Sequence, residues 1–303
     1  MSTYDPAALE CLAAIVEEGG FERAAQRLNV TQSAVSQRLR ALEAQVGSVL
    51  IVQPPAQAHQ RGAVAAQAHQ AAAPAARRPG ARPAGAGPQR PGGSREDERI
   101  SIAINADSIA TWAMGALHDL VRQRLPLEII TDDQDFTQEW LRSGQVLGCV
   151  TTLKSRRCGG CKMVPLGAMH YVAVASADFA RKHLPQGLTP HNFRDVSFLS
   201  FNRKDDMAAE FVARTFGLKR VALNHLFVPS TEGQMRAVSA GWGVGVMPEL
   251  LARGPIADGS LVDLVPGHFL PIQLYWHCWN LESELLDALT EALKATAANT
   301  LVT

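Results

Sequence analysis

Four polar side chains near the N-terminus recur at the spacing of a single helix face. Ser33, Ser36, Gln37 and Arg40 stand at positions i, i+3, i+4 and i+7. Serine and glutamine can read base edges in the DNA major groove, and arginine can bind guanine or a phosphate. The pattern indicates either a DNA-contacting helix or the solvated face of a plain three-helix bundle. The first 52 residues hold four basic and six acidic side chains, which does not favour DNA.

Three neighbouring side chains complete the candidate DNA-binding set. Thr31 can cap this helix, and together with Gln32 it is expected to position the helix on phosphate. Arg38 lies in the same helix and adds a second cation to it.

A second group of polar side chains follows the predicted strands of the C-terminal two thirds. Parallel α/β folds bind ligands at the carboxyl ends of their strands. A helix N-terminus suits a carboxylate ligand, and a cationic ligand needs acidic partners. Alternatively, Asp107 is only an N-cap, and any other single acid is a solvated surface charge. The candidates are Asn105, Asp107, Ser108, Thr111, Asp132, Asp133, Thr151, Asn202, Asp205, Asp206 and Glu232.

The remaining reactive side chains do not form a catalytic or metal-binding pattern. Cys158 and Cys161 enclose two glycines, but zinc normally needs four ligands and only His170 follows nearby, so we predict a loop without metal or disulfide. Residues 241–245 (GWGVG) reverse the order of a dinucleotide-binding loop and predict a turn. His277 lies on an apolar strand, which favours a core position. No nucleophile–base pair is recognisable, so we expect neither an enzyme nor a cofactor.

The composition is that of a globular protein of the reducing cytoplasm. The 303 residues include 47% hydrophobic residues, and 29 basic side chains balance 29 acidic ones. Five scattered cysteines do not form a disulfide framework. The N-terminus has no basic segment followed by an apolar run, and no stretch approaches about 18 apolar residues. We therefore expect no signal peptide and no membrane span.

Three helices are predicted to position the polar face near the N-terminus. Asp5 can cap a helix that begins at Pro6 and stops at Gly19 and Gly20. Residues 21–28 repeat apolar side chains at helical spacing, and after a short turn a third helix runs to about residue 47. A helix, a tight turn and a second helix with an exposed polar face make the helix-turn-helix geometry.

Residues 53–95 differ from the rest of the chain in composition. The segment's 43 residues comprise 14 Ala, 7 Pro, 6 Gly, 6 Arg and 6 Gln, with no aromatic or acidic residue. It has too little apolar surface to offset its ordering entropy, so we predict disorder.

Strand and helix patterns alternate from residue 99 onward. Such alternation predicts an α/β architecture with parallel sheets covered by helices on both faces. The predicted strands are 99–105, 127–133, 146–152, 171–176, 196–202, 226–230 and 273–279. The predicted helices are 107–124, a segment ending near 141, 178–183, 205–216, 231–240 and 282–298.

Four sequence strings resemble a known family. Residues 21–47 (FERAAQRLNVTQSAVSQRLRALEAQVG) strongly resemble the helix-turn-helix of the LysR-type transcriptional regulators. The strings INADSIATW at 104–112, DDM at 205–207 and LYWHCW at 274–279 resemble the ArgP/LysG (IciA-like) branch, which regulates the export of arginine and lysine. The resemblance covers about residues 1–52 and 97–303.

The resemblance implies a domain organisation. A winged helix-turn-helix at 1–52 is joined by a linker at 53–96 to an effector domain at 97–303, whose two Rossmann-like lobes are similar to periplasmic binding proteins. Lobe I is expected at about 97–167 and 270–303, and lobe II at about 168–269. The chain is expected to cross between the lobes near 166–168 and 269–272.

The resemblance also implies partners and a ligand. Family members act as homodimers or homotetramers on double-stranded promoter DNA in the bacterial cytoplasm, at the nucleoid, where RNA polymerase is a further partner. A basic amino acid is expected between the lobes, with its carboxylate at Ser108 and Thr111 and its amino groups near Asp132, Asp205 or Glu232. The sequence does not decide whether the effector is lysine or arginine. It also leaves open which operator is bound and whether the chain activates or represses transcription.

Residues 53–95 depart from the family pattern, which expects the DNA-binding wing and an amphipathic linker helix there. Either the segment is read out of frame, with compensating shifts near Val52 and Arg95, or it is a natural flexible linker. Two functions therefore stay open: an amino-acid-responsive regulator, or an effector-binding protein whose DNA binding is impaired. We expect a flexibly tethered N-terminal domain and dimerisation through the effector domains.

Overall fold

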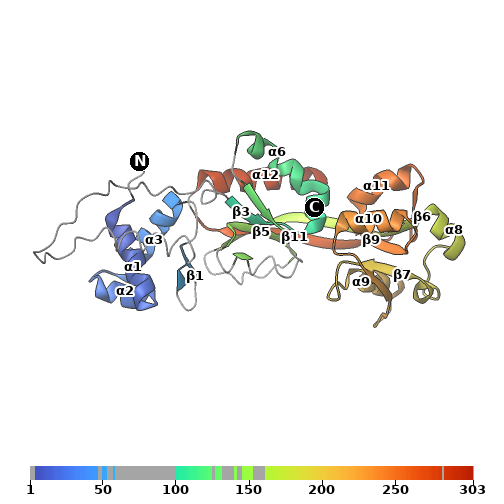
Figure 1. Ribbon diagram of the computed structural model, residues 1–303, viewed down its shortest axis with the longest axis horizontal. Helices are drawn as coiled ribbons and strands as arrows, with labels where there is room; N and C mark the ends of the chain where they lie inside the picture. The colour runs from blue at the N-terminus through green and yellow to red at the C-terminus, as the bar shows by residue number, and fades with distance from the viewer. Residues whose placement is uncertain are drawn as a thin grey trace, which may run out of the picture.

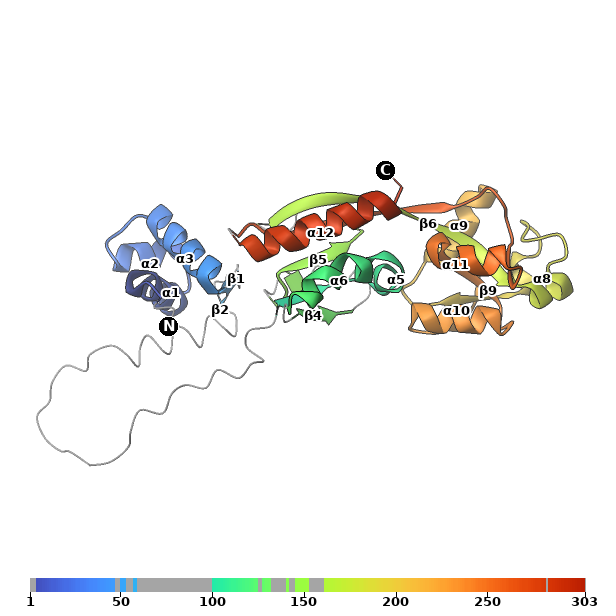
Figure 2. The same cartoon turned by 90° about the horizontal axis from the view of Figure 1, so that it is seen from above.

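The computed structural model of the chain describes residues 4–46, 50–52, 57–58, 100–124, 127–131, 140–141, 145–152, 161–281 and 283–302. These residues form a three-helix unit and two α/β lobes, and the C-terminal helix returns from the second lobe to the first (Figures 1 and 2). Most of the predicted linker, the helix expected to end near residue 141, and Asp132, Asp133 and Cys158 lie outside the described residues.

The N-terminal unit contains the three helices that the sequence predicts. They are α1 (Pro6–Glu18), α2 (Phe21–Arg27) and α3 (Gln32–Val46). The Asp5 carboxylate accepts a hydrogen bond from the Ala7 amide (3.1 Å), and Gly19 ends α1 in the left-handed region at φ 64°. The apolar faces of the helices meet in one core, which includes Leu12, Ile15, Val35 and Leu42.

A short β-pair follows α3. Strand β1 (Ile51–Val52) pairs antiparallel with β2 (Gln57–Ala58). The buried carboxylate of Glu43 on α3 accepts hydrogen bonds from the Leu50 and Ile51 amides (2.9 and 3.4 Å), which ties the start of β1 to the helix. A two-residue pair thus stands where the family pattern places a wing.

Nine strands of the described chain form one mixed sheet. Along the sheet their order is β4-β3-β5-β11-β6-β9-β7-β8, and β10 also pairs with β6. The strands are β3 (Ile100–Ala103), β4 (Leu127–Ile130), β5 (Gly148–Thr151), β6 (Cys161–Ser176), β7 (Ser197–Ser200), β8 (Asn224–Phe227), β9 (Val244–Pro248), β10 (Leu261–Asp263) and β11 (Leu270–Trp279).

The parallel arrangement predicted from the alternating pattern holds only within each lobe. Strand β3 is parallel to β4 and β5, and β7 is parallel to β8 and β9. In contrast, β6 and β11 run antiparallel to each other and to their other neighbours. These two strands are much longer than the predicted 171–176 and 273–279, because they continue from one lobe into the other.

Helices cover the strands of both lobes (Figures 1 and 2). Lobe I carries α5 (Ala106–Ser108), the π-helical turn η2 (Ile109–Ala113), α6 (Met114–Arg122) and α12 (Glu284–Thr300). Lobe II carries α8 (Ala177–His183), the 3-10 turn η3 (Phe193–Asp195), α9 (Met207–Phe216), α10 (Thr231–Ser239) and α11 (Glu249–Ala257).

Strands β6 and β11 form the connection between the lobes. They pair with each other over their length, with one register shift, where Leu274 and Tyr275 lie opposite Gly167 and Pro165. The shift leaves Leu166 as the extra residue of a bulge, and Gly167 takes φ 121°, a conformation that favours glycine. The irregularity lies where the resemblance implies the first crossing.

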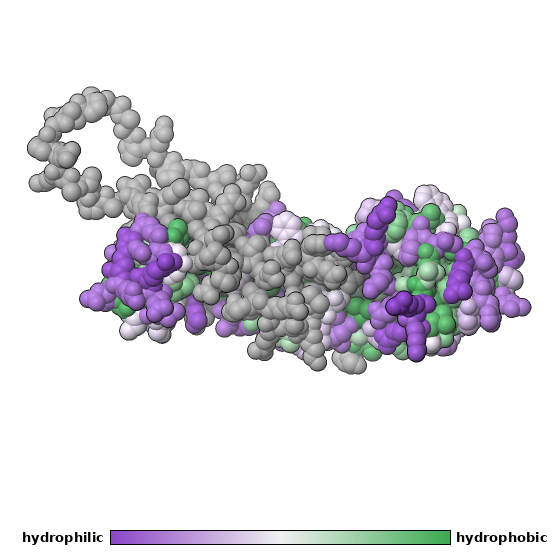
Figure 3. All heavy atoms as spheres, turned by 90° about the horizontal axis from the view of Figure 1, so that it is seen from below, coloured by the Kyte–Doolittle hydropathy of each residue, from purple (hydrophilic) through white to green (hydrophobic). Residues whose placement is uncertain are grey.

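None of the described helices is long and apolar enough to cross a membrane. On the face that Figure 3 shows, the three-helix unit and lobe II are mostly hydrophilic, with hydrophobic residues interspersed.

Candidate functional site

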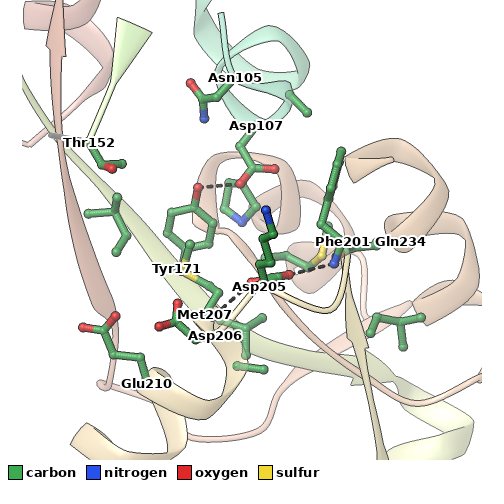
Figure 4. A pocket seen from close by; sticks show the side chains of 18 residues that line it. Asn105, Asp107, Thr152, Tyr171, Phe201, Asp205, Asp206, Met207, Glu210 and Gln234 are labelled. Atoms are coloured by element: carbon green, nitrogen blue, oxygen red, sulfur yellow. Dashed lines mark hydrogen bonds between the residues drawn. The ribbon is translucent and has the colours of Figure 1, made fainter. Parts of the chain in front are cut away.

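A cavity of about 210 Å³ is lined by residues of both lobes (Figure 4). Lobe I contributes the residues that follow β3 and β5, and lobe II contributes the loop before α9, the first turn of α9 and parts of α10 and β9. The polar lining residues are Asn105, Asp107, Thr152, Tyr171, Lys204, Asp205, Asp206, Glu210 and Gln234.

Asp107 joins three parts of the two-lobed unit. Its Oδ2 accepts a hydrogen bond from the hydroxyl of Tyr171 on β6 (2.6 Å), and its Oδ1 accepts one from the hydroxyl of Thr231 on α10 (2.5 Å). The N-cap of the helix is Asn105, so the alternative that Asp107 is only an N-cap is wrong. The carboxylate instead connects lobe I with β6 and with lobe II.

Withdrawal from water governs the ionisation of this group. Burial raises the pKa of Asp107, and the hydrogen bonds from Thr231 and Tyr171 partly offset the rise, while the nearby charge of Asp205 adds to it. Burial also raises the pKa of Tyr171 well above its ordinary value, and the Asp107 charge raises it further. Tyr171 therefore stays a hydrogen-bond donor at physiological pH.

Acidic side chains predominate on the lobe II side of the cavity. Asp205, Asp206 and Glu210 line it together with Lys204. The Asp205 carboxylate accepts hydrogen bonds from the backbone amides of Phe201 (2.7 Å) and Met207 (3.0 Å), so it also holds the turn that leads into α9. Asp206 is the N-cap of α9 and Glu210 lies in its first turn, and Figure 4 shows both at the cavity.

Two polar side chains at the start of α5 are buried without partners among the described residues. Both side-chain atoms of Asn105 and the hydroxyl of Ser108 make no hydrogen bond. The hydroxyl of Thr111, predicted as a ligand donor, donates instead to the carbonyl oxygen of Asp107 (2.6 Å) and lies 3.7 Å from the Met169 sulfur. Thr111 is therefore engaged within the helix and does not line the cavity.

The other predicted residues that the structure describes do not line the cavity. Thr151 is buried, and Thr152 lines the cavity in its place. Asn202 accepts a hydrogen bond from the Lys204 amide (2.7 Å) and so shapes the loop. The Glu232 side chain is exposed and is not part of the lining. Asp132 and Asp133 lie outside the described residues.

The sequence-based candidates omit six residues of this site, namely Thr152, Tyr171, Lys204, Glu210, Thr231 and Gln234. Tyr171 stands within a strand pattern that appeared wholly structural, and Thr231 and Gln234 follow the helix cap of Ser230. Only Glu210 carried a usable signal, because it follows Asp206 by one helical turn.

The predicted DNA-contacting face of α3 is largely accessible. Gln32, Ser33, Gln37 and Arg40 are exposed, and Ser36 is half-buried. Thr31 caps the helix, because its hydroxyl accepts a hydrogen bond from the Ala34 amide (3.1 Å). Arg38 is half-buried, and its guanidinium group lies 3.9 Å from the sulfur of Cys11 on α1.

The prediction that Cys161 has no disulfide is wrong. Cys161 is disulfide-bonded, whereas Cys11, Cys149 and Cys278 are free. His277 is buried in β11, in agreement with its apolar neighbours. Within the described ranges, no group of three or more His, Cys, Asp or Glu side chains could hold a metal ion.

Two family patterns match the chain. The pattern of the bacterial regulatory helix-turn-helix proteins of the lysR family matches residues 6–59, and that of the LysR substrate binding domain matches residues 93–298. Among curated proteins, the HTH-type transcriptional regulator LysG of Mycobacterium tuberculosis H37Rv is 40% identical over 295 residues, covering 96% of this chain and 92% of that protein. The regulator ArgP of Pseudomonas aeruginosa PAO1 is 37% identical over 311 residues, covering 100% and 99%.

The similar solved structures are also of regulators named ArgP and LysG. The crystal structure of ArgP from Mycobacterium tuberculosis superposes with a TM-score of 0.65 and 36% identity over 99% of each chain. Full-length LysG from Corynebacterium glutamicum with the bound effector Arg superposes with a TM-score of 0.62 and 29% identity, over 99% of this chain and 100% of that one.

Proposed function

Because the chain belongs to the LysR family of bacterial transcriptional regulators, and to its LysG and ArgP type, we propose that it controls a promoter in response to a basic amino acid. The relatives are named as regulators, so the function is regulation and not catalysis. The proposed effector is arginine or lysine, and the proposed target is a gene for an amino-acid exporter.

The charge of the cavity is the observation that supports a cationic effector. Four carboxyl groups, those of Asp107, Asp205, Asp206 and Glu210, line the cavity together with a single ammonium group, that of Lys204. Asp107 is withdrawn from water and Asp205 is half-buried, whereas Asp206 and Glu210 are exposed; a bound cation relieves the repulsion among these like charges. A basic side chain that enters between the lobes therefore has acidic partners on both sides.

The relative from Corynebacterium glutamicum supports arginine as one such effector. Its structure carries the effector Arg, and its fold corresponds to this chain over the full length. Arginine and lysine share a carboxylate, an α-ammonium group and a cationic end, so the acid-rich lining suits both.

Calorimetry on the full chain tests the effector class. We expect arginine and lysine to bind more tightly than leucine, because a neutral side chain brings no positive charge to the acidic lining. Glu210→Gln is expected to weaken the binding of basic amino acids noticeably. Glu284→Gln, at an exposed position on α12, is the matched control and leaves the binding unchanged. Equal affinities for leucine and lysine contradict the proposed ligand class.

Residues 31–40 are the proposed DNA-contacting segment. Its exposed polar side chains and the capped start of α3 support recognition of the major groove. A gel-shift assay with the region upstream of a neighbouring exporter gene tests this proposal, and a shift that is specific and responds to arginine or lysine supports it.

The composition of residues 53–95 favours a second candidate function, namely effector binding without effective promoter control. Seven prolines oppose a continuous linker helix, and half-sites are read tightly only when two DNA-binding units are held at fixed spacing. Under this alternative the chain binds arginine or lysine but shifts no promoter fragment. Translation of the gene in the other two frames separates a frameshift from a natural linker, because only a frameshift restores a wing and a leucine-periodic helix.

A further inference from the structure

Asn105 occupies an unusual position for an amide side chain. It follows β3 and is the N-cap of α5, yet it makes no capping hydrogen bond. Its side chain is only 2% exposed, and neither its Oδ1 nor its Nδ2 has a partner among the described residues. The residue lines the cavity between the lobes, and Figure 4 shows it beside Asp107 at the lobe I side.

An amide buried in this way lacks the hydrogen-bond partners that its oxygen and its nitrogen require. Asparagine at an N-cap normally accepts a hydrogen bond from the first helical turn, and buried polar groups are nearly always paired. A donor and an acceptor left unpaired destabilise the empty protein. A ligand that offers an acceptor and a donor side by side would satisfy both groups together.

We propose that Asn105 hydrogen-bonds the α-carboxylate and the α-ammonium group of the effector, so that the site accepts an intact cationic α-amino acid and rejects the corresponding decarboxylated amine. The proposal rests on the proposed function, because it concerns the same cavity and the same effector. The Nδ2 group donates to the carboxylate, and Oδ1 accepts from the ammonium group. The cationic end of the side chain then faces the acids of lobe II.

Electrostatic attraction and hydrogen bonding make opposite predictions for the choice between arginine and its decarboxylated amine, agmatine. Agmatine is arginine without its carboxylate, so it carries one more net positive charge, and the acidic lining by itself attracts it more strongly than arginine. Agmatine leaves the Nδ2 donor of Asn105 buried and unpaired, however, and such sites reject analogues that lack the matching group. A preference for arginine therefore isolates the contribution of Asn105.

Calorimetry with L-arginine and agmatine on the full chain tests the proposal. A hydrogen bond to a charged group changes affinity by about 10- to 150-fold, so we expect arginine to bind at least about tenfold more tightly than agmatine. Asn105→Leu, which is nearly isosteric, is expected to remove this preference, and Asn105→Asp to reverse it by repelling the carboxylate. Asn280→Leu, at an exposed position, is the control and keeps the preference.

The melting temperature separates this role from a structural one. Because Asn105→Leu removes an unpaired buried amide, its melting temperature without ligand is expected to equal or exceed that of the wild type. A lower melting temperature together with the loss of both ligands overturns the proposal and makes Asn105 a structural residue. Equal binding of arginine and agmatine by the wild type also overturns it, while a cationic effector remains supported. If neither of these compounds nor lysine binds, the proposed function itself is overturned, and this proposal with it.

Discussion

The hydroxyl of Thr231 in lobe II donates a hydrogen bond to the carboxylate of Asp107 in lobe I, with 2.5 Å between the two oxygens. The same carboxylate accepts from Tyr171 on β6, the strand that runs through both lobes. An acid of the proposed effector site is thus also a contact between the lobes, so a ligand that approaches Asp107 acts on the relation of the lobes directly.

Loss of the Thr231 hydroxyl is expected to destabilise the effector domain. Thr231→Val preserves the shape of the side chain but leaves Asp107 with Tyr171 as its remaining side-chain donor. Since hydrogen bonds to charged groups contribute about 1.5–3 kcal/mol, the free energy of unfolding in urea should fall by a comparable amount. Thr231→Ser keeps the hydroxyl and should lose much less. Equal losses for both variants would show that packing matters here and the hydrogen bond does not.

The raised pKa of Asp107 predicts a specific dependence of stability on pH. The folded chain binds the Asp107 proton more tightly than the unfolded chain, so this group lowers the free energy of unfolding as pH rises from the ordinary Asp range through its raised pKa. Asp107→Asn removes the titration. Urea denaturation of both proteins between about pH 4 and 8 should show a flatter pH profile for the variant. Parallel profiles would contradict the prediction.

Protons are also expected to compete with the effector. A cationic ligand near Asp107 favours the ionised carboxylate, so arginine affinity should fall as the pH is lowered through the raised pKa of this group. Calorimetry in buffers of different ionisation enthalpy measures the accompanying release of protons. Release that is unchanged in Asp107→Asn would assign it to another group.

Local signals in the sequence predicted most of the elements but not their long-range pairing. The helix at Thr231 was predictable, because Ser230 caps it and its hydroxyl accepts from the Gly233 amide. Helix α11 was missed because Gly254 and Pro255 normally oppose a helix. Only the C-terminal part of strand β6 was predicted, because Pro165 and Gly167 resemble a turn, whereas in the sheet they accommodate a bulge.

The sequence predicted several acidic residues of the candidate site but not the residues that hydrogen-bond to Asp107. Asp107, Asp205 and Asp206 follow from their placement after strands. The partners of Asp107 lie 64 and 124 residues away along the chain, and no local pattern brings Tyr171 and Thr231 to it. Such contacts are set by the packing of the lobes.

The exposed face of α3 gives a prediction for DNA recognition. If Gln37 contacts a base, Gln37→Ala should reduce discrimination between operator and scrambled duplex by about 1–3 kcal/mol, measured by fluorescence anisotropy. Gln45→Ala, also exposed but near the end of α3, should leave the discrimination unchanged. An equal effect of the two substitutions would contradict a specific role for Gln37.

Close packing at β5 predicts intolerance of a single methyl group. A Cβ atom on Gly148 would lie 2.2 Å from the ring of the buried Trp276, whose indole donates to the Thr290 hydroxyl (3.0 Å). Gly148→Ala should therefore lower the free energy of unfolding by about 1–3 kcal/mol. Gly115→Ala on α6 is the matched control, because its Cβ meets only the Thr296 methyl group at 3.9 Å, and it should be neutral or stabilising. A neutral Gly148→Ala would show that Trp276 moves aside easily.

The pairing of β6 with β11 also determines which relative motion of the lobes costs the least free energy. The two crossing strands are bonded to each other from Cys161 and Trp279 to Tyr171 and Leu270, so they act as one ribbon and not as two independent tethers. Sliding one strand along the other breaks the whole ladder, whereas a bulge lets a ribbon bend and twist locally. The two lobes are therefore joined by a single two-stranded ribbon, which can twist more easily than it can shear. A ligand bound between the lobes, as proposed, would therefore act on their relative twist more readily than on their separation.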